Sequence, residues 1–163
     1  MKASAFIRVH PRSLSGSPMT PPPRTFIAAT EDDTIALGAQ LAAEWPRPCV
    51  VLLIGNLGAG KTTMAKGIAE GLGIARADDV TSPTFPLIHE YGDAGELFHI
   101  DLYRLDTAAE VESLGLDEIF SRRAVVLLEW AERFPALLPR ERIEIRIEAR
   151  DDDARLVTVS ELT

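Results

Sequence analysis

The sequence predicts an α/β fold of three layers, with a mostly parallel central sheet and antiparallel hairpin additions. Two continuous apolar runs of strand length, Cys49–Ile54 and Ala124–Leu128, are typical of parallel strands that are buried on both faces. A glycine-rich segment over 55–62 connects the first run to an amphipathic helix. Beyond Ile143, apolar and charged residues alternate, which indicates an antiparallel pair.

The composition limits the size and the location of the protein. The chain has 163 residues, of which 46% are hydrophobic and 26% charged, as is typical of a single globular domain. No apolar run approaches the ~18 to 20 residues of a membrane span. Cys49 is the only cysteine, so an internal disulfide is excluded, and we interpret it as a buried structural thiol in a cytoplasmic protein.

The formal net charge of −8 argues against direct binding of nucleic acid. An acidic protein repels phosphate backbones unless lysine and arginine gather in a local stripe. The sequence contains no such stripe. We therefore expect no direct contact with nucleic acid.

The beginning of the chain differs in composition from the rest. Residues 1–24 are rich in proline and serine, cannot supply a core, and are interpreted as a disordered tail. The predicted domain spans residues 25–163. Translation starting at Met19 would remove most of the tail; the alternative is a targeting peptide, because the segment is basic and contains no acid before Glu31.

The domain is expected to begin with a short strand over Arg24–Ala28, followed by a helix. Thr30 and Asp33 have the spacing of a helix N-cap and an acidic third position. Pro46 and Pro48 should end this helix, because proline lacks a backbone N–H and clashes with the preceding turn.

Further elements follow the glycine-rich segment. A helix is predicted over 61–71, because its apolar residues recur every fourth position at Met64, Ile68 and Leu72. Leu87–Tyr91 and Leu97–Asp101 flank a turn and predict a hairpin, and a helix is expected over Thr107–Leu114. The buried run that starts at Ala124 ends at Glu129. The last two predicted strands flank a turn at 151–153 and carry Ile143, Ile145 and Ile147, then Leu156, Val157 and Val159.

The segment 55–62 matches the phosphate-binding pattern G-x-x-x-x-G-K-[ST]. Its glycines let successive backbone N–H groups converge on phosphates beside the positive end of a helix. Lys61 is expected to reach the β- and γ-phosphates, and the Thr62 hydroxyl to bind Mg²⁺. We therefore predict a P-loop NTPase-like fold. The residues of the loop expected to contact the nucleotide are Asn56, Leu57, Gly58, Ala59, Gly60, Lys61, Thr62 and Thr63.

Magnesium also needs a protein carboxylate, which such folds place at the carboxyl end of a buried strand. Two acids meet this condition. Glu129 follows one buried strand directly, and Asp101 ends another. Either carboxylate could contact Mg²⁺ while the other orients the attacking water, and with Lys61 they form the expected catalytic set.

The expected nucleotide is ATP. Guanine recognition usually involves N-K-x-D or T-K-x-D, and the chain contains neither. Asn56 is the only asparagine, and no lysine follows Lys66. His89 and His99 have no metal-ligand spacing, so we expect structural or surface histidines and no zinc site.

Four motifs in the same order resemble the TsaE family, also called YjeE. They are the segment from Gly55 to Thr63, Ser82-Pro83-Thr84-Phe85, the segment from His99 to Leu105, and Leu128-Glu129-Trp130. The likeness extends from about residue 25 onward. It implies a P-loop fold with an inserted hairpin and an ATPase role in bacterial tRNA threonylcarbamoyladenosine synthesis, at the adenosine in position 37.

The resemblance also implies partners and residue roles. ATP hydrolysis would act on the TsaB–TsaD complex, in which TsaD transfers the threonylcarbamoyl group. Thr62 and Glu129 match the magnesium positions, Asp101 matches an essential aspartate, and Ser82–Phe85 matches a switch-like loop near the γ-phosphate. Trp130 matches a tryptophan beside the nucleotide. Glu31 lies where an N-terminal segment of the family touches the nucleotide.

One position departs from the family pattern. Asn56 stands where the family usually has an acid, and we expect this change to affect partner contacts or local hydrogen bonding rather than nucleotide binding. Two other functions are compatible with a P-loop. One is a small-molecule kinase, although Arg122-Arg123 is the only adjacent arginine pair that a lid could use. The other is a switch in which nucleotide binding acts without hydrolysis.

Overall fold

A computed structural model describes residues 20–163 of the protein. The interpretation of the chain's beginning as a tail therefore falls mainly on residues 1–19, outside the described part. A seven-stranded sheet forms the middle layer, in the order β1-β7-β6-β2-β5-β4-β3. The strands are β1 (Arg24–Ala28), β2 (Cys49–Ile54), β3 (Ile88–Tyr91), β4 (Leu97–Asp101), β5 (Val125–Glu129), β6 (Arg142–Ala149) and β7 (Arg155–Leu162).

The four central strands are parallel, and antiparallel strands extend the sheet on both sides. β2 pairs in parallel with β5 and β6, and β5 pairs in parallel with β4. β7 and β1 add antiparallel strands beyond β6, and β3 adds one beyond β4. The predicted three-layer α/β fold is confirmed.

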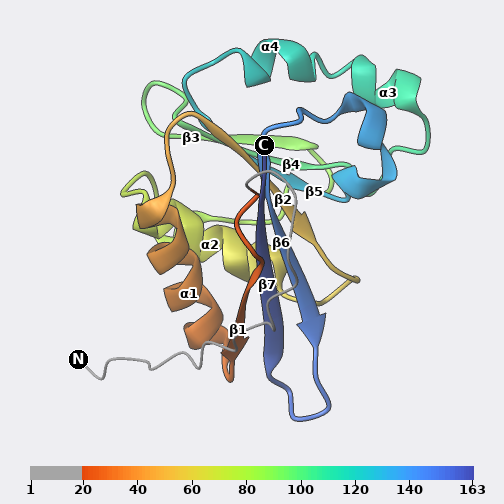
Figure 1. Cartoon of the computed structure of the whole chain (residues 1–163). Helices are drawn as coiled ribbons and strands as arrows, with labels where there is room; N and C mark the ends of the chain where they lie inside the picture. Colours follow the sequence, from red (N-terminus) through yellow and green to blue (C-terminus); the bar gives the residue numbers. More distant parts are fainter. Residues whose placement is uncertain (1–19) are drawn as a thin grey trace.

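Helices cover both faces of the sheet (Figure 1). α1 (Glu31–Glu44) and α2 (Lys61–Gly71) lie on one face. The shorter α3 (Ala108–Glu112) and α4 (Leu116–Phe120) lie on the other, with the 3₁₀ turns that follow β5, η2 (Ala131–Arg133) and η3 (Pro135–Leu137). The remaining 3₁₀ turn, η1 (Ala77–Asp79), follows α2.

The two long helices begin and pack as their sequences indicate. Thr30 and Asp33 form a reciprocal capping box at the start of α1, which satisfies backbone N–H groups that the helix cannot pair internally. Further along, α1 and α2 cross at very close range. A Cβ at Gly67 would collide with the backbone carbonyl of Ile35, so only glycine fits this crossing.

The predicted helix over Thr107–Leu114 is too long. Thr107 caps α3 as expected, but the helix ends at Glu112. The Ser113 hydroxyl donates to the Glu110 carbonyl, and Gly115 takes a left-handed conformation with φ 69°. The chain then turns into α4, a helix that the apolar periodicity did not indicate.

Side chains along each strand point alternately to the two faces of the sheet, and so pack against different helices. In β4 and β5, Leu97, Val125 and Leu127 pack with α1 and α2, whereas Phe98, Val126 and Leu128 pack on the opposite face. Side chains two residues apart share a face. His99, Asp101 and Glu129 therefore belong to the α2 face, at or near the carboxyl ends of their strands.

Candidate functional site

The glycine-rich loop between β2 and α2 has a backbone that glycine alone adopts easily. Gly58 and Gly60 have φ values of 77° and 109°, in the left-handed region. Gly55 lies against the next strand, where an added Cβ would stand 2.6 Å from the Ile147 carbonyl oxygen. The loop leads into the N-terminus of α2, whose first backbone N–H groups have no partner within the helix. This is an arrangement suited to binding an anion.

A distant arginine holds the same loop in place. Arg155, the first residue of β7, donates from Nε to the Ala59 carbonyl at 2.8 Å. Its Nη1 also donates to the carbonyls of Asp153 and Ala154, at 2.7 and 3.3 Å. Arg155 thus joins the turn between β6 and β7 to the loop.

Lys61, the first residue of α2, is only 5% exposed. Its ammonium group donates to the carbonyls of Gly55 and Asn56, at 2.5 and 3.0 Å, and lies 4.1 Å from the centre of the Trp130 ring. Burial lowers the pKa of Lys61, while the negative charges of Glu129, Glu132 and Asp101 act in the opposite direction. The cation is therefore held at the loop by carbonyl oxygens, an aromatic face and nearby carboxylates.

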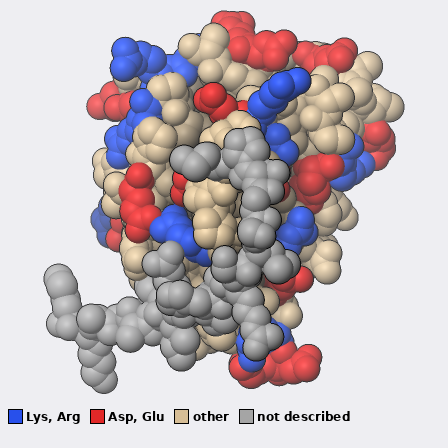
Figure 2. Space-filling model, viewed as in Figure 1, with Lys and Arg blue, Asp and Glu red and all other residues tan. Residues whose placement is uncertain are grey.

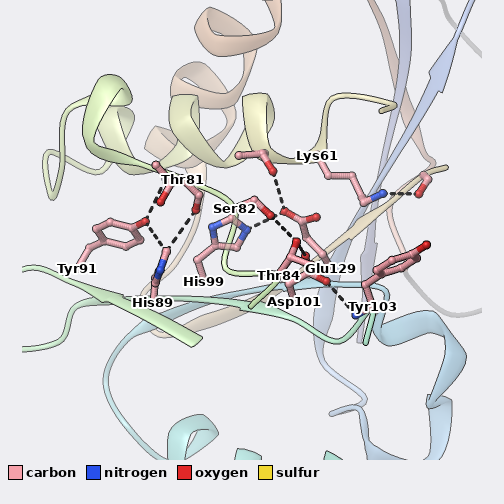
Figure 3. Close-up of polar contacts among 12 residues, drawn as sticks. Lys61, Thr81, Ser82, Thr84, His89, Tyr91, His99, Asp101, Tyr103 and Glu129 are labelled. Carbon is pink, nitrogen blue, oxygen red and sulfur yellow. Dashed lines mark hydrogen bonds and ion pairs between the residues drawn. The ribbon is translucent and has the colours of Figure 1, made fainter. Parts of the chain in front are cut away.

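Glu129 ends β5 and is 3% exposed. Its Oε1 accepts a hydrogen bond from the Thr62 hydroxyl at 3.4 Å and lies 2.8 Å from Nε2 of His99 (Figure 3). A hydroxyl and a carboxylate side by side provide two oxygen ligands of the kind that Mg²⁺ prefers. The predicted pair Thr62 and Glu129 therefore meets in the folded chain.

Asp101 is the neighbour of Glu129 in the parallel register of β4 and β5 and is 2% exposed. Its Oδ2 accepts from the Thr84 hydroxyl at 2.7 Å, and its Oδ1 accepts from the Tyr103 backbone N–H at 2.9 Å. Ser82 lies 2.8 Å from Thr84, oxygen to oxygen. The segment around Thr84 is thus connected directly to this carboxylate.

Trp130 follows Glu129 in a left-handed conformation with φ 63°, which is rare for a bulky side chain. Its ring lies 5.1 Å from that of Tyr103, centre to centre, and covers Lys61. Strained residues of this kind concentrate at functional sites.

These side chains surround a cavity of about 300 Å³. It is lined by Leu57, Gly58, Gly60, Lys61, Thr62, Thr63, Ser82, Thr84, Asp101, Tyr103, Glu129 and Trp130. Asn56 and Ala59 instead line an adjacent hollow of about 320 Å³ together with residues 146–149 of β6. Glu31 is exposed in the first turn of α1 and lines neither hollow, so its nucleotide contact stays a prediction.

Two residues that matter for this geometry were not predicted. His99 was expected to be structural or on the surface, and it is fully buried against Glu129. Its position two residues before Asp101 on one strand was a usable signal, because such residues share a face. The sequence contains no such signal for Arg155, because its contact with the Ala59 carbonyl depends on the position of β7 in the sheet. Within residues 20–163, no group of three or more His, Cys, Asp or Glu side chains is arranged to hold a metal.

The fold and this site together define a class: an α/β protein of P-loop-like architecture, with a glycine-rich loop facing two buried carboxylates. A family model described as "Threonylcarbamoyl adenosine biosynthesis protein TsaE" matches residues 28–157. The chain belongs to the TsaE family, which takes part in tRNA threonylcarbamoyladenosine biosynthesis.

Individual relatives agree with this assignment. The chain is 49% identical over 122 residues to the tRNA threonylcarbamoyladenosine biosynthesis protein TsaE of Bacillus subtilis, covering 74% of this chain and 75% of that protein. It is 37% identical over 113 residues to that of Haemophilus influenzae, covering 69% and 70%. A crystal structure of Bacillus subtilis YdiB matches with a TM-score of 0.72 and 39% identity, over 90% of both chains.

No helix within the described residues is both long enough and apolar enough to cross a membrane.

Proposed function

We propose that this protein binds ATP with Mg²⁺ and hydrolyses it, as the ATPase component of the tRNA threonylcarbamoyladenosine machinery. The observation that carries the proposal is the meeting of Lys61, Thr62, Asp101 and Glu129 around one cavity at the carboxyl ends of parallel strands. Lys61 would neutralise the β- and γ-phosphates, and the loop N–H groups would bind their oxygens. ATP rather than GTP is favoured by the absence of a guanine-recognition motif from the sequence.

The contacts of the two carboxylates suggest a division of roles. Glu129 lies beside the Thr62 hydroxyl, which favours Glu129 as the magnesium carboxylate. Asp101 is connected instead to Thr84, which suits a group that orients the attacking water and responds to movement of the 82–85 segment. Phosphoryl transfer depends on positioning and electrostatic stabilisation, and these residues would supply both.

We further propose that the protein acts on the TsaB–TsaD complex and that hydrolysis is slow without it. Three large apolar side chains are exposed: Leu57 and Tyr103, which line the cavity, and Phe85, which follows the lining residue Thr84, at 75%, 44% and 79%. Such a group of exposed apolar side chains is suited to a protein partner. On the face shown in Figure 2, basic side chains are interspersed with acidic ones rather than gathered into a stripe. This arrangement favours a protein partner over direct contact with tRNA.

The stimulation would come from an added positive charge. An arginine that stabilises the transferring phosphoryl group is worth about 10³ to 10⁵ in rate. The arginine would come from a partner, or from Arg104 or Arg133 after docking. Arg104 now lies 5.0 Å from the centre of the exposed Phe85 ring, and Arg133 donates to the Tyr103 carbonyl at 3.0 Å.

The test is Mg²⁺-dependent ATP hydrolysis by the purified chain, alone and with the matching TsaB and TsaD. We expect partner-stimulated turnover that Lys61→Ala and Glu129→Ala abolish. Lys66→Ala, which changes a partly exposed lysine farther along α2, serves as the control and should leave turnover unchanged. Unchanged turnover on adding both partners contradicts the proposed partner role, and phosphoryl transfer to a metabolite faster than to water identifies a kinase instead.

A further inference from the structure

His99 is a buried polar side chain that the roles described so far leave unexplained. It lies in the middle of β4 with no exposed surface, on the sheet face toward α2. The cavity lining does not include it, so it lies beneath the site rather than in it. Burying an imidazole among apolar residues costs free energy unless its nitrogens are hydrogen-bonded.

Only one of its two nitrogens has a partner in the described part of the chain. Nε2 lies 2.8 Å from Oε1 of Glu129, and Nδ1 is buried without a hydrogen-bond partner. A carboxylate accepts, so the proton of this bond belongs on Nε2. A second proton on Nδ1 would face no acceptor. The geometry thus matches an imidazole that carries a proton on Nε2 and directs its one bond at Glu129.

That bond restricts the orientation of the Glu129 carboxylate. A glutamate has three rotatable bonds, and its terminal torsion is only weakly restricted by local geometry. Oε1 is held between two groups, the Nε2 of His99 below and the Thr62 hydroxyl at 3.4 Å toward the cavity. Figure 3 shows the bond between the His99 ring and the Glu129 carboxylate. Without the shorter bond, the carboxylate could rotate away from Thr62.

We propose that His99 is a positioning residue that holds Glu129 toward Thr62 and thereby sets the affinity of the site for the magnesium ion that accompanies the nucleotide. The inference rests on the proposed function, since Glu129 and Thr62 hold magnesium only if Mg·ATP binds. Groups that orient metal ligands in this way typically change metal affinity about 10- to 100-fold when they are removed. His99 acts through Glu129 and does not touch the nucleotide.

The test measures the Mg²⁺ concentration that gives half-maximal ATP hydrolysis by the full chain with its partner proteins. His99→Leu fills the space without a donor, and it should raise this concentration by about 10- to 100-fold. ATP binding measured in EDTA should stay unchanged. His99→Gln returns an N–H donor at a similar reach and should restore most of the Mg²⁺ response. His89→Leu, at the paired position of β3, is the matched control and should leave the Mg²⁺ response unchanged.

Two results would overturn the role of His99: an unaltered Mg²⁺ response in a folded His99→Leu variant, or an equal loss in the Leu and Gln variants. A second test uses the wild-type protein, so its result does not depend on whether a variant folds. Nitrogen-15 NMR of labelled histidine should find the proton of His99 on Nε2, and a proton on Nδ1 alone would also contradict the bond. Wild type that neither binds nor hydrolyses Mg·ATP contradicts the proposed function instead, and the NMR result still decides whether the bond exists.

Discussion

Two hollows at opposite ends of the parallel strands, the cavity lined by Lys61 and a hollow at the amino ends, differ in chemistry more than in size. The hollow at the carboxyl ends measures about 300 Å³ and contains Lys61, Asp101 and Glu129. The hollow at the amino ends measures about 430 Å³. Its walls are mainly apolar and include Trp45, Pro46, Pro48, Cys49, Val50, Phe120, Ala124, Val126 and Pro139.

Buried charge, rather than volume, distinguishes the candidate site in this fold. Buried charges cost free energy and persist where they have partners or a task. At the carboxyl ends, each buried carboxylate accepts hydrogen bonds from neighbours that also line or support the cavity. At the amino ends, burial instead suppresses the one reactive group, because it raises the pKa of the Cys49 thiol to about 11 despite the nearby Arg47 charge.

The largest expected effect comes from removing one negative charge at the carboxyl ends of the parallel strands. Glu129→Gln keeps the shape of the side chain but removes the negative charge beside Thr62. Turnover in the presence of the partners should fall at least about 100-fold, the scale on which one preorganised electrostatic group acts. Glu141→Gln, at an exposed acid lining the amino-end hollow, should have no effect in the same assay. Similar turnover of the two variants would remove the distinction between the ends.

The next effect concerns Cys49. A thiol with a pKa near 11 is about 100-fold less ionised at pH 8 than an ordinary thiol, and the thiolate is the reactive form. Alkylation of the folded protein by iodoacetamide should be slower by about that factor than alkylation of the same chain unfolded in urea. The rate should keep rising with pH through 10. A rate that levels off near pH 9 would show an ordinary thiol.

A smaller effect is expected from the packing of the amino-end hollow. Val126 lines it and is 1% exposed. Val126→Ala removes two buried methyl groups and should lower the free energy of unfolding by about 2 kcal/mol, measured in urea. Turnover per folded molecule should be retained. Loss of turnover in a folded Val126→Ala protein would indicate that the amino-end hollow takes part in function.

The smallest effect concerns the loop itself. Arg155→Met removes the bond to the Ala59 carbonyl but keeps much of the side-chain length. A hydrogen bond from a charged group contributes about 1.5 to 3 kcal/mol when buried and less when partly exposed. We expect ATP affinity to fall about fivefold in a binding titration. Arg150→Met, at an arginine whose side chain pairs with the neighbouring Asp152 carboxylate, should leave the affinity unchanged, and an equal loss in both variants would contradict the role of Arg155.

Much of the fold could be predicted from the sequence, because β2 and β5 are short apolar runs and α1 and α3 begin at clear capping boxes. α3 and α4 were the exception, since the helix predicted over Thr107–Leu114 ends already at Glu112 and α4, beyond Gly115, was not predicted. Lys61 and Thr62 came from a local motif, and Asp101 and Glu129 from their place at strand ends. What could not be predicted depends on contacts between distant segments, namely the pairing that joins His99 to Glu129 and the placement of β7 that brings in Arg155.

The contact between Arg155 and Ala59 has a consequence for the order of events during protein synthesis. The two residues are 96 positions apart in the chain. The loop, α2 and both carboxylates are synthesised before Arg155. The loop is therefore present in the growing chain before the residue that holds it is added. Nucleotide affinity should reach its full value only after β7 has been added to the sheet.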